Sequence, residues 1–569
     1  MKQIFFLCLM LCNSSFILGQ KLILAHNGIS EYKIIKPHHA TEIEIKAANE
    51  IQFYLAKISG ITIPILNDNV KFSPKEILIG KTNRNKTIGS GLTPDGIIIK
   101  TIGQKLFISG GDRKGVLYSV YSFLEDYLNC RKLAAGIDIL PKQKTIIIGK
   151  INYKHNPSFS FRSTFFINNA DTAYNNWHKT NYFFEGYHSN AHSFHWLLPA
   201  NKYFQKHPEY FALIDGKRNP SQPCLSHPAV YNIMLANLRK EIAAYPHINI
   251  WSVSQNDGYN YCHCNICEAV YKKEGGYMGV LLPFVNKFAI AFPNKTISTL
   301  AFLFSDEPPK TIKPERNVEI VYCTWNTSRK IPISKSKDER SQQVRRQLKE
   351  WKKLTDNILV WDYISNFVHS LYPFPNLQTI QPNLEYYRSL QIERMFQQGI
   401  GYMQGEFSEL KGYLVCKLLW DINIDREKLT EDFVNHYYGP ASPYILSYLK
   451  SLEKEVLKDE EDLKMTSHAL LHKDGYLSSS NRAHYHQLFS KAEAATKNTI
   501  YYERVVQERL ALDYADINIA AYTRNTSINS FNKKIESFIQ DAKKYGIHFL
   551  NEARDSPAKK MEMFKNARK

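Results

Sequence analysis

The sequence predicts an α/β protein in which a central (β/α)8 barrel of the TIM type lies between an N-terminal α/β domain and a C-terminal helical domain. Three observations predict this fold class. Short β-branched segments alternate with helical patterns near the start, longer apolar segments alternate with helices in the middle, and only helical spacing remains near the end. The chain has 569 residues, more than one hydrophobic core normally serves, so several domains are expected.

Residues 1–19 are predicted to form a signal peptide. Lys2 provides the positive charge, Ile4–Leu11 the apolar run, and Gly19 the small residue before the cleavage site. The run is too short to span a bilayer, and no later stretch has the length and lack of charge of a transmembrane helix. We expect an exported protein, in the periplasm or at the cell surface. A lipid anchor at Cys12 is a weaker alternative.

Residues 20–155 are predicted to form the N-terminal α/β domain. Short β-rich segments are separated by glycine and polar residues, and two longer segments have apolar residues at helical spacing. The double glycine Gly110-Gly111 does not match a dinucleotide-binding fingerprint. The expected strands are 21–25, 32–36, 76–80, 96–101 and 105–110, and the expected helices are 40–59 and 111–128.

Residues 156–425 are predicted to form the barrel, because apolar segments that end in polar or aromatic residues alternate with helices. Continuous apolar strands of this kind indicate a parallel sheet that is covered on both faces. In a barrel of this type the chemistry takes place at the carboxyl ends of the strands. The apolar segments are 248–255, 296–304, 318–325, 357–364 and 400–406, and helices are expected at 281–292 and 339–354.

Residues 426–569 show amphipathic helical spacing, and the basic stretch 557–569 is expected to fray. The net charge is +19, but the lysines are dispersed and not gathered in one block. A solvated basic surface explains this charge better than a polyanion site, and export makes nucleic acid an improbable partner.

The first candidate site is the turn that follows the predicted strand 248–255. Asn256 and Asp257 would lie at the upper rim of the barrel, where Gly258 permits a tight turn. A carboxylate beside an amide there is suited to protonating a leaving oxygen or orienting a substrate amide. An ordinary Asn-Asp-Gly turn with a local side-chain hydrogen bond is the alternative.

A second group follows the predicted strand at 400–403. Gln404 and Glu406 would end this strand, and Glu409 would lie in the first turn of the next helix. Glu409 is equally well explained by the preference of acidic residues for helix N-termini. Glu406, at the junction of strand and helix, is a candidate for catalysis at the rim.

Aromatic and polar residues end two further strands. Trp361, Asp362 and Tyr363 end one segment, and Trp325 with Asn326 ends the preceding one. Aromatic rings beside a carboxylate are a common way to bind a sugar ring.

His188, His192 and His195 are spaced closely enough to suggest a metal site. They lack the H-E-x-x-H pattern and alternate with aromatic residues, which favours a wall of a binding cleft. His192 is therefore retained as a substrate-binding candidate.

Cleavage of the leader would leave seven cysteines, an odd number, so at least one thiol is unpaired or pairs between chains. Cys224, Cys262, Cys264 and Cys267 form a cluster for which two interpretations remain open. Four thiolates are the ligand set of a structural zinc ion, whereas an oxidising environment favours disulfides. In either case the cluster would hold the loop behind the Asn-Asp-Gly turn.

Several of these motifs together resemble a known family. "SVSQNDGYNYCHCNIC", "PFPNLQTIQPNLEYY", "GEFSELKGYLVCKLLWD" and "HYYGPA", in this order, are similar to exported Bacteroidetes proteins of glycoside hydrolase family 163. "GVLYSVYSFLEDYLNCRKL" resembles the N-terminal domain of α-glucuronidases. The resemblance implies endo-β-N-acetylglucosaminidase activity, which releases complex-type N-glycans by cutting the GlcNAc-β-1,4-GlcNAc core. It implies a glycan or glycoprotein substrate and no cofactor for catalysis.

Enzymes that cut after N-acetylglucosamine often use the 2-acetamido oxygen of the substrate as the nucleophile. The protein then supplies an acid for the departing oxygen and a group that orients the acetamido N–H. Asp257 and Glu406 are the candidates for these roles, with Asn256 and Glu409 in support. The alternatives are an exo-acting hexosaminidase or uronidase, and a glycan-binding protein without catalysis.

Overall fold

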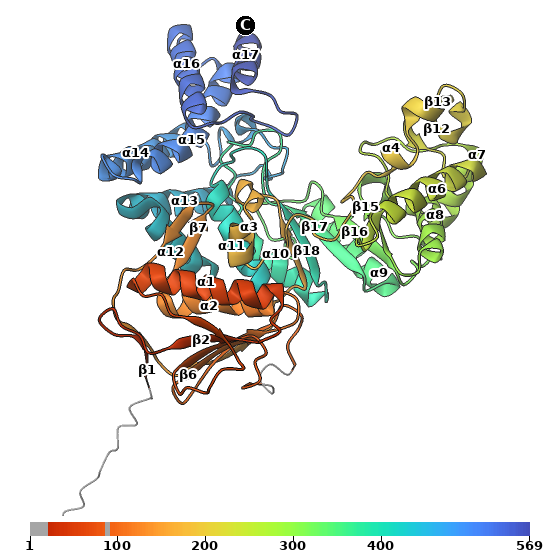
Figure 1. Ribbon diagram of the computed structural model, residues 1–569. Coiled ribbons are helices and arrows are strands. Elements are labelled where there is room, and N and C mark those ends of the chain that lie inside the picture. The colour runs from red at the N-terminus through yellow and green to blue at the C-terminus, as the bar shows by residue number, and fades with distance from the viewer. Residues whose placement is uncertain (1–20, 86–90) are drawn as a thin grey trace, which may run out of the picture. The chain divides into compact units, whose positions relative to one another are not determined.

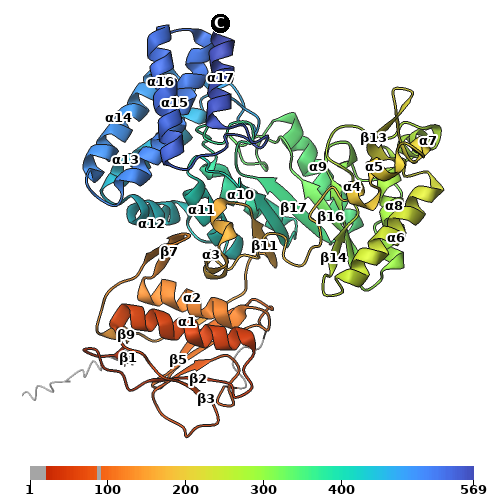
Figure 2. The same cartoon turned by 45° about the horizontal axis from the view of Figure 1, so that its top comes forward.

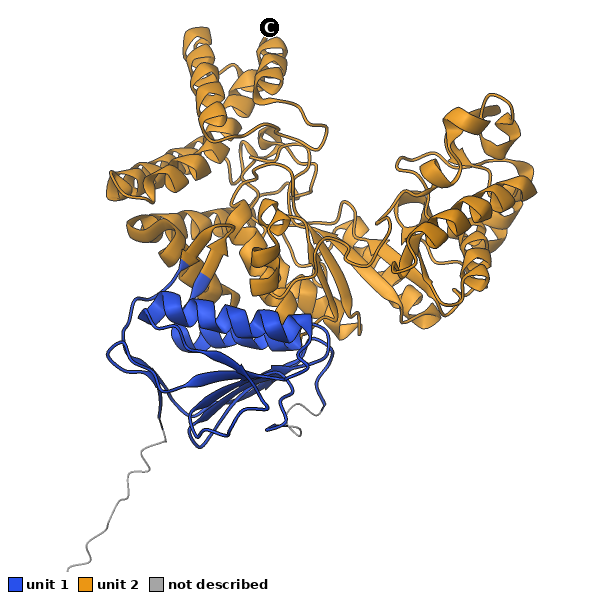
Figure 3. Cartoon of the chain, in the orientation of Figure 1, with its two compact units in different colours: residues 1–131, 139–156 blue, residues 132–138, 157–569 orange. Residues whose placement is uncertain are grey.

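The structure is a computed structural model that describes residues 21–85 and 91–569. The predicted signal peptide lies outside the described residues. The chain divides into two compact units, residues 1–131 with 139–156 and residues 132–138 with 157–569 (Figure 3). Among the described residues, no helix is both long enough and apolar enough to cross a membrane.

The first unit is a six-stranded mixed sheet with two helices packed side by side on one face (Figure 1). The predicted strands and helices of this part are confirmed. In spatial order the sheet contains β10 (Asn152–His155), β5 (Ile97–Ile102), β6 (Lys105–Gly110), β4 (Glu76–Ile79), β2 (Lys33–Lys36) and β3 (Ile65–Asn67). The helices are α1 (Glu42–Ser59) and α2 (Gly115–Leu128), and β1 (Leu22–Ala25) pairs separately with β9 (Ile146–Ile148).

Local signals set the ends of these helices. Thr41 caps α1: its hydroxyl accepts a hydrogen bond from the Glu44 N–H, and the Glu44 carboxylate accepts one from the Thr41 N–H. The helix ends at Gly60, whose φ of 80° suits glycine. A Cβ atom on Gly110 would lie 2.1 Å from the carbonyl carbon of Gly115. The glycine at the end of β6 therefore permits close approach of α2, which gives that residue a packing role.

The second unit contains a parallel sheet that curls into part of a barrel. Helices follow its strands, as predicted for a parallel sheet. In spatial order the strands are β11 (Phe161–Thr164), β18 (Arg394–Gln398), β17 (Ile358–Tyr363), β16 (Val318–Cys323), β15 (Thr296–Ala301) and β14 (Ile250–Ser252). The main helices beside them are α8 (Met278–Ala291), α9 (Glu339–Leu354), α10 (Leu377–Ser389) and α11 (Ser408–Trp420).

An irregular segment joins the two edges of this sheet. The Asn181 N–H donates to the Arg162 carbonyl beside β11 at 2.7 Å, and the Ile250 N–H of β14 donates to the Gly186 carbonyl at 3.2 Å. Single parallel bridges link Ser163 to Asn181 and Tyr187 to Ile250. Residues 181–187 thus close the gap between β11 and β14 without forming a regular strand. The predicted eight-stranded barrel is not confirmed; the sheet has six parallel strands and this connecting segment.

One strand lies earlier in the sequence than predicted. The expected strand at 400–403 is wrong, because β18 ends at Gln398 and residues 401–403 form a turn. Ile400 and Met403 are nevertheless buried in the core at the strand ends, which explains why their apolar pattern resembled a strand. The error matters for the site, since Glu406 does not directly follow a strand.

Between β11 and β14 the chain forms a group of further helices and strands. Earlier in the chain, β7 (Arg131–Ala134) pairs with β8 (Ile137–Ile139) in a separate two-stranded sheet. The antiparallel hairpin of β12 and β13 is the part of this group that reaches the candidate site. The elements before β14 are α3 (Thr172–Trp177), α4 (Phe194–Leu197), α5 (Ala200–Tyr203), β12 (Phe211–Ile214), β13 (Lys217–Pro223) and α6 (Pro228–Ala244), and α7 (Asn265–Glu274) follows β14.

The chain after residue 425 is helical, as predicted. Residues 557–569 do not fray: α17 (Pro557–Arg568) buries Met561 and Phe564 in a core shared with α15 and α16. The prediction failed because it relied on the many basic residues of this segment and not on its apolar residues. The other helices are α12 (Arg426–Tyr438), α13 (Ser442–Val456), α14 (Ser479–Thr496), α15 (Tyr502–Thr523) and α16 (Ile528–Lys544).

A buried ion pair lies under the ends of β16 and β17. The Arg329 guanidinium donates to the Asp362 carboxylate at 2.6 Å and to the Thr324 carbonyl at 3.1 Å. Arg329 and Asp362 are each 1% exposed. Removing one member of such a pair leaves a buried charge without compensation.

We predict that Arg329→Met lowers the free energy of unfolding by about 3–5 kcal/mol. The double variant Arg329→Met/Asp362→Leu should recover much of this loss, because no charge then remains buried. Arg388→Met is the control, since Arg388 and Glu393 form an exposed pair at 3.4 Å, and it should cost less than about 1 kcal/mol. Urea denaturation of the three variants measures these differences; equal losses for Arg329→Met and Arg388→Met would contradict the prediction.

His369 connects the segment after β17 to the C-terminal helices. Its Nδ1 lies 2.6 Å from the Tyr514 hydroxyl. Burial, with a smaller contribution from the positive charges of Lys560 and His468, lowers the pKa of His369 to about 3. The ring is therefore neutral in the folded protein at neutral and mildly acidic pH.

This shift predicts acid sensitivity. A histidine in the unfolded chain takes up its proton near pH 6.5, roughly its ordinary pKa, so below this pH the unfolded state binds more protons than the folded state. The free energy of unfolding should fall by up to about 1.4 kcal/mol per unit of decreasing pH from this residue alone. His369→Gln should flatten the profile between about pH 6.5 and pH 4. His484→Gln, on the exposed face of α14, should leave it unchanged; equal profiles for both variants would exclude this role of His369.

Candidate active site

A cavity of about 480 Å³ lies at the carboxyl ends of the parallel strands. Most of its lining comes from the last three residues of a strand or from the segment that follows it, because parallel strands end at the same edge of the sheet. The lining side chains at these ends are Phe165 after β11, Asp257 after β14, Phe302 and Leu303 after β15, Trp325 after β16, Trp361 and Tyr363 of β17, and Phe396 and Gln398 of β18.

Aromatic rings form most of the wall. Trp325 lies edge-on to Phe302 at 5.8 Å and to Tyr363 at 5.7 Å between ring centroids. The Trp361 indole N–H donates to Gln398 Oε1 at 2.6 Å, which fixes the ring plane. Three of the predicted binding residues, Trp325, Trp361 and Tyr363, thus line one cavity. Such rings offer apolar faces on which a sugar ring can stack.

Asp362 does not join them. In a strand, successive side chains point to opposite faces, so Trp361 and Tyr363 face the cavity while Asp362 points away. Its carboxylate binds Arg329 and accepts hydrogen bonds from the Thr324 hydroxyl at 2.5 Å and the Tyr363 N–H at 2.9 Å. The prediction that Asp362 binds substrate is therefore corrected: it is a buried structural residue.

Asp257 lines the cavity from the turn after β14 and is exposed. Its Oδ1 accepts a hydrogen bond from the Gly258 N–H at 2.9 Å, and Gly258 has a φ of 121°. This is the local turn that was expected as the alternative explanation, but it leaves the carboxylate at the cavity. The turn and the candidate catalytic position therefore coexist.

Asn256 holds this turn to the β12–β13 hairpin. Its side-chain amide donates to the Ser221 carbonyl at 2.8 Å, and its backbone N–H donates to Gln222 Oε1 at 3.1 Å. The Gln222 side chain in return donates to the Asn256 carbonyl at 2.7 Å. Asn256 does not line the cavity, so its contribution is to position Asp257.

A second carboxylate of the cavity was missed by the sequence analysis. Glu552 lines the same cavity and lies close enough to Asp257 for their charges to interact. Although Glu552 is an exposed residue, partial removal of its carboxyl group from water, together with the negative charge of Asp257, raises its pKa. Two carboxyl groups thus lie at one aromatic cavity.

Backbone hydrogen bonds place Glu552 there. The Glu552 N–H donates to the Phe367 carbonyl at 2.9 Å, and the Ser370 N–H donates to the Leu550 carbonyl at 2.8 Å. The α16–α17 connection therefore pairs with the segment that follows β17, and Figure 2 shows it running near the ends of the strands. Arg554 lies 5.2 Å from the Tyr402 ring and adds a cation–π contact.

Glu406 and Glu409 lie elsewhere. Glu406 is 5% exposed, forms an ion pair with Lys411, and its backbone N–H donates to the Ser370 carbonyl. Both oxygens of Glu409 accept hydrogen bonds from the Gln404 amide, at 3.0 and 3.1 Å. None of these residues lines the cavity. The structure does not bring Glu406 and Asp257 together, because β18 already ends at Gln398 and the Glu406 N–H pairs with the Ser370 carbonyl away from the cavity.

A buried acidic cluster surrounds Glu406. Burial raises the pKa of Glu406 and of Glu409, and raises that of Glu508 well above its usual range. Glu508 accepts hydrogen bonds from the Phe407 N–H and the Tyr438 hydroxyl, each at 3.0 Å. Phe407 has a φ of 45°, so Glu508 supports an unusual backbone conformation at the start of α11. These contacts indicate a structural role.

Of the three histidines, only His192 lines the cavity. Its Nδ1 lies 2.9 Å from the Gln255 carbonyl. His188 stacks on Trp251 at 4.4 Å and His195 contacts the His192 carbonyl, so the three rings do not form a metal site. Asn326 lies beside the cavity and is not among its lining residues.

Three residues with left-handed backbone lie at or beside the cavity. His192 and Leu303, which line the cavity, both have a φ of 54°, and Asn326 has a φ of 57°. Each such residue costs of order 1–3 kcal/mol and persists where surrounding contacts hold it. Strain of this kind is typical of functional sites.

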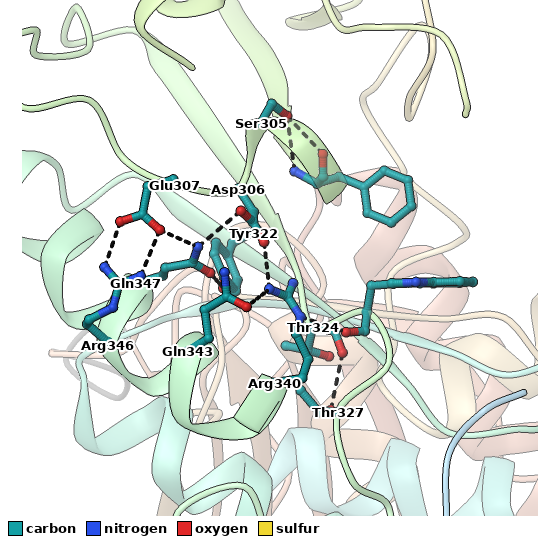
Figure 4. Close-up of polar contacts among 12 residues, drawn as sticks. Ser305, Asp306, Glu307, Tyr322, Thr324, Thr327, Arg340, Gln343, Arg346 and Gln347 are labelled. Carbon is teal, nitrogen blue, oxygen red and sulfur yellow. Dashed lines mark hydrogen bonds and ion pairs between the residues drawn. The ribbon is translucent and has the colours of Figure 1, made fainter. Parts of the chain in front are cut away.

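A polar network under α9 holds two cavity segments (Figure 4). Arg340 donates to the Trp325 carbonyl at 3.0 Å and to the Asp306 carboxylate at 2.6 Å. Gln347, about two turns further along the same face of α9, donates to the other oxygen of Asp306 at 3.0 Å and accepts from the Tyr322 hydroxyl at 2.5 Å. The network fixes the backbone of Trp325 and the turn that carries Leu303.

The four predicted cysteines do meet in space. Their sulfur atoms all lie within 4.8 Å of one another, and the Cys224 and Cys264 sulfurs are 3.7 Å apart. In the described part of the chain, this is the only group of three or more such side chains that is placed to hold one metal ion.

Solved structures that are similar to this chain include three glycoside hydrolases, whereas no curated protein matches it. A GH138 enzyme that targets the pectin rhamnogalacturonan II is 9% identical, with a TM-score of 0.45 and coverage of 94% of this chain and 98% of that one. CpGH84B is 12% identical, with a TM-score of 0.40 and coverage of 96% and 97%. The N-acetyl-β-hexosaminidase of Streptomyces plicatus, in complex with Thio-NAglucal, is 10% identical, with a TM-score of 0.43 and coverage of 73% and 91%.

A family comparison matches residues 133–450, which is more than half of the chain. It does not confirm the more specific resemblance to glycoside hydrolase family 163. The chain belongs to the DUF4838 family, described as a domain of unknown function.

Proposed function

We propose that the protein is a glycoside hydrolase and that the cavity at the carboxyl ends of β14–β18 is its active site. The observation that carries this proposal is the pair of carboxyl groups, Asp257 and Glu552, at one cavity walled by aromatic rings. Hydrolysis of a glycosidic bond passes through an oxocarbenium-like state and usually requires two acidic groups. The volume of about 480 Å³ is within the usual range of ligand sites.

Glu552 is the proposed general acid. Its raised pKa extends the pH range in which it holds a proton, and this proton passes to the glycosidic oxygen as the bond to C1 breaks. The Asp257 carboxyl group, the other member of this proposed acid pair, would lie beside the reacting ring. In a substrate-assisted reaction it accepts the acetamido N–H while the acetamido oxygen attacks C1, and water then opens this intermediate.

The proposed substrate is a complex-type N-glycan, cut between the two core N-acetylglucosamine units. This specificity rests on the sequence resemblance to glycoside hydrolase family 163. Export to the periplasm or cell surface belongs to the same proposal, because glycoprotein substrates occur outside the cytoplasm. Trp325, Trp361 and Tyr363 would bind the sugar rings, and His192 would contact the edge of the site.

Replacing either carboxyl group tests the catalytic assignment. Asp257→Asn and Glu552→Gln should each lower kcat by about 10²–10⁴-fold, because each removes an acid–base or charge-stabilising group from the transition state. Asp215→Asn, in the exposed β12–β13 turn, and Glu562→Gln, on the exposed side of α17, are matched controls that should retain activity. Unchanged melting temperatures would show that folding is intact.

The pH profile separates the two roles. A general acid must be protonated, so wild-type activity should decline as the pH rises through the pKa of Glu552. Glu552→Gln should lose this decline and keep only a low, flat rate. If both carboxyl variants keep full activity, or if the decline persists in Glu552→Gln, the assignment is wrong.

A single assay distinguishes the modes of action. Incubation with a complex N-glycoprotein, followed by mass spectrometry, should release an intact oligosaccharide that ends in one N-acetylglucosamine. A released monosaccharide would instead identify an exo-acting hexosaminidase or uronidase. Binding without any release, unaffected by Asp257→Asn, would indicate a glycan-binding protein.

A further inference from the structure

We propose that Cys224, Cys262, Cys264 and Cys267 bind one structural zinc ion, which holds the loop that carries Asp257 against the β12–β13 hairpin. The proposal concerns a site about which the catalytic assignment makes no statement. It rests on the positions of the sulfur atoms and on the contacts of the segments that supply them.

The distances fit a shared metal ion. Zinc binds four thiolates tetrahedrally at about 2.3 Å, which separates neighbouring sulfurs by roughly 3.8 Å. The Cys224 and Cys264 sulfurs lie 3.7 Å apart, and all four sulfurs lie within 4.8 Å of one another. Two disulfides would instead need two separate pairs, each with sulfurs about 2.05 Å apart. Four sulfurs arranged around one centre are what a metal ion requires.

The surroundings favour thiolate ligands. The Leu213 N–H donates to the Cys262 sulfur at 3.3 Å. Cys264 is the N-cap residue of α7, a helix of ten residues, so the positive end of its dipole faces this ligand. The Ser226 hydroxyl lies 3.3–3.4 Å from the Cys224, Cys264 and Cys267 sulfurs. These groups supply the outer contacts that orient metal ligands.

Burial protects the cluster from oxidation. Cys224, Cys262 and Cys267 are each at most 3% exposed, and only Cys264 is partly accessible. Binding requires no oxidant: four S–H groups release their protons to water as four Zn–S bonds form, and no electrons are transferred. Disulfide formation would require an external oxidant to remove two electrons per bond.

The site connects two segments that are distant in sequence. Cys224 directly follows β13, while Cys262 and Cys264 lie between the Asp257 turn and α7, and Cys267 lies in the first turn of α7. The His263 N–H donates to the Leu213 carbonyl of β12 at 2.8 Å, so the loop also lies along the hairpin. With Asn256 bound to β13 at one end and the metal at the other, both ends of the loop 256–267 are fixed. The ion thereby restricts the motion of Asp257 without touching the cavity.

Metal analysis of the full chain tests the proposal without any activity assay. Protein purified without a metal-affinity step should contain about one zinc ion per chain by plasma mass spectrometry. Titration with a mercurial thiol reagent should release this zinc, and cobalt substitution should give the absorption of tetrahedral cobalt thiolates. Cys224→Ser and Cys264→Ser should lose the metal, whereas Cys416→Ala, a buried cysteine outside the cluster, should keep it.

Two measurements on the unaltered chain keep the test decisive if the variants fail to fold. Intact mass should correspond to reduced thiols, whereas each disulfide would remove two hydrogens. Removal of the metal with a chelator should raise the rate of amide hydrogen exchange in the peptide 253–264. The rate in β16 should not change. Absence of metal, iron in place of zinc, or a mass that shows disulfides within the cluster would overturn the proposal. None of these results depends on whether the cavity hydrolyses glycans.

Discussion

The common direction of the six strands in the second unit determines the rest of its site. Because β11, β18, β17, β16, β15 and β14 are all parallel, their carboxyl ends meet at one edge, and the residues that follow them surround one space. The period of two along each strand then decides which side chains reach this space. Trp361 and Tyr363 do, while Asp362 lies between them and pairs with Arg329. The same constraint produces both the aromatic wall and the ion pair that supports it.

The remaining part of the site comes from chain segments outside the sheet. Two backbone pairings, between Phe367 and Glu552 and between Ser370 and Leu550, join the C-terminal helical part to the segment after β17. The contact of His369 with Tyr514 lies on the same segment. The C-terminal helices thus place one of the two carboxyl groups at the cavity, which gives them a part in the site beyond packing.

The regular elements could be predicted from the sequence because their signals are local. The helix 339–354 matches α9 residue for residue, and the segment 318–325 contains β16 followed by Trp325 at the cavity. Prediction failed where tertiary packing determines the outcome. Ile400 and Met403 pack in the core from a turn, so an apolar pattern of strand type placed β18 too late in the sequence and Glu406 wrongly at the rim.

Glu552 shows a different limit. It lies in a short connection between two helices, and no spacing, motif or apolar pattern around it distinguishes it from other exposed acidic residues. Its position depends on hydrogen bonds to residues nearly two hundred positions earlier, such as the bond to Phe367. Asp257 could be found because it lies in an Asn-Asp-Gly turn shortly after an apolar segment of strand type, which is a local feature. One carboxyl group of the pair was therefore accessible to sequence reasoning and the other was not.

The position of Asp257 depends on the β12–β13 hairpin more than on the six-stranded parallel sheet. A turn centred on Gly258, with φ near 121°, gains little rigidity from its own backbone, because glycine loses more conformational entropy on ordering than any other residue. The hairpin compensates through Ser221 and Gln222, which bind Asn256, and through Leu213, which binds both Cys262 and His263. Loosening the hairpin would therefore move the carboxylate while the aromatic wall stays in place. Sugar binding and bond cleavage should consequently be separable by changes at this hairpin, since the rings and the carboxylate are held by different parts of the chain.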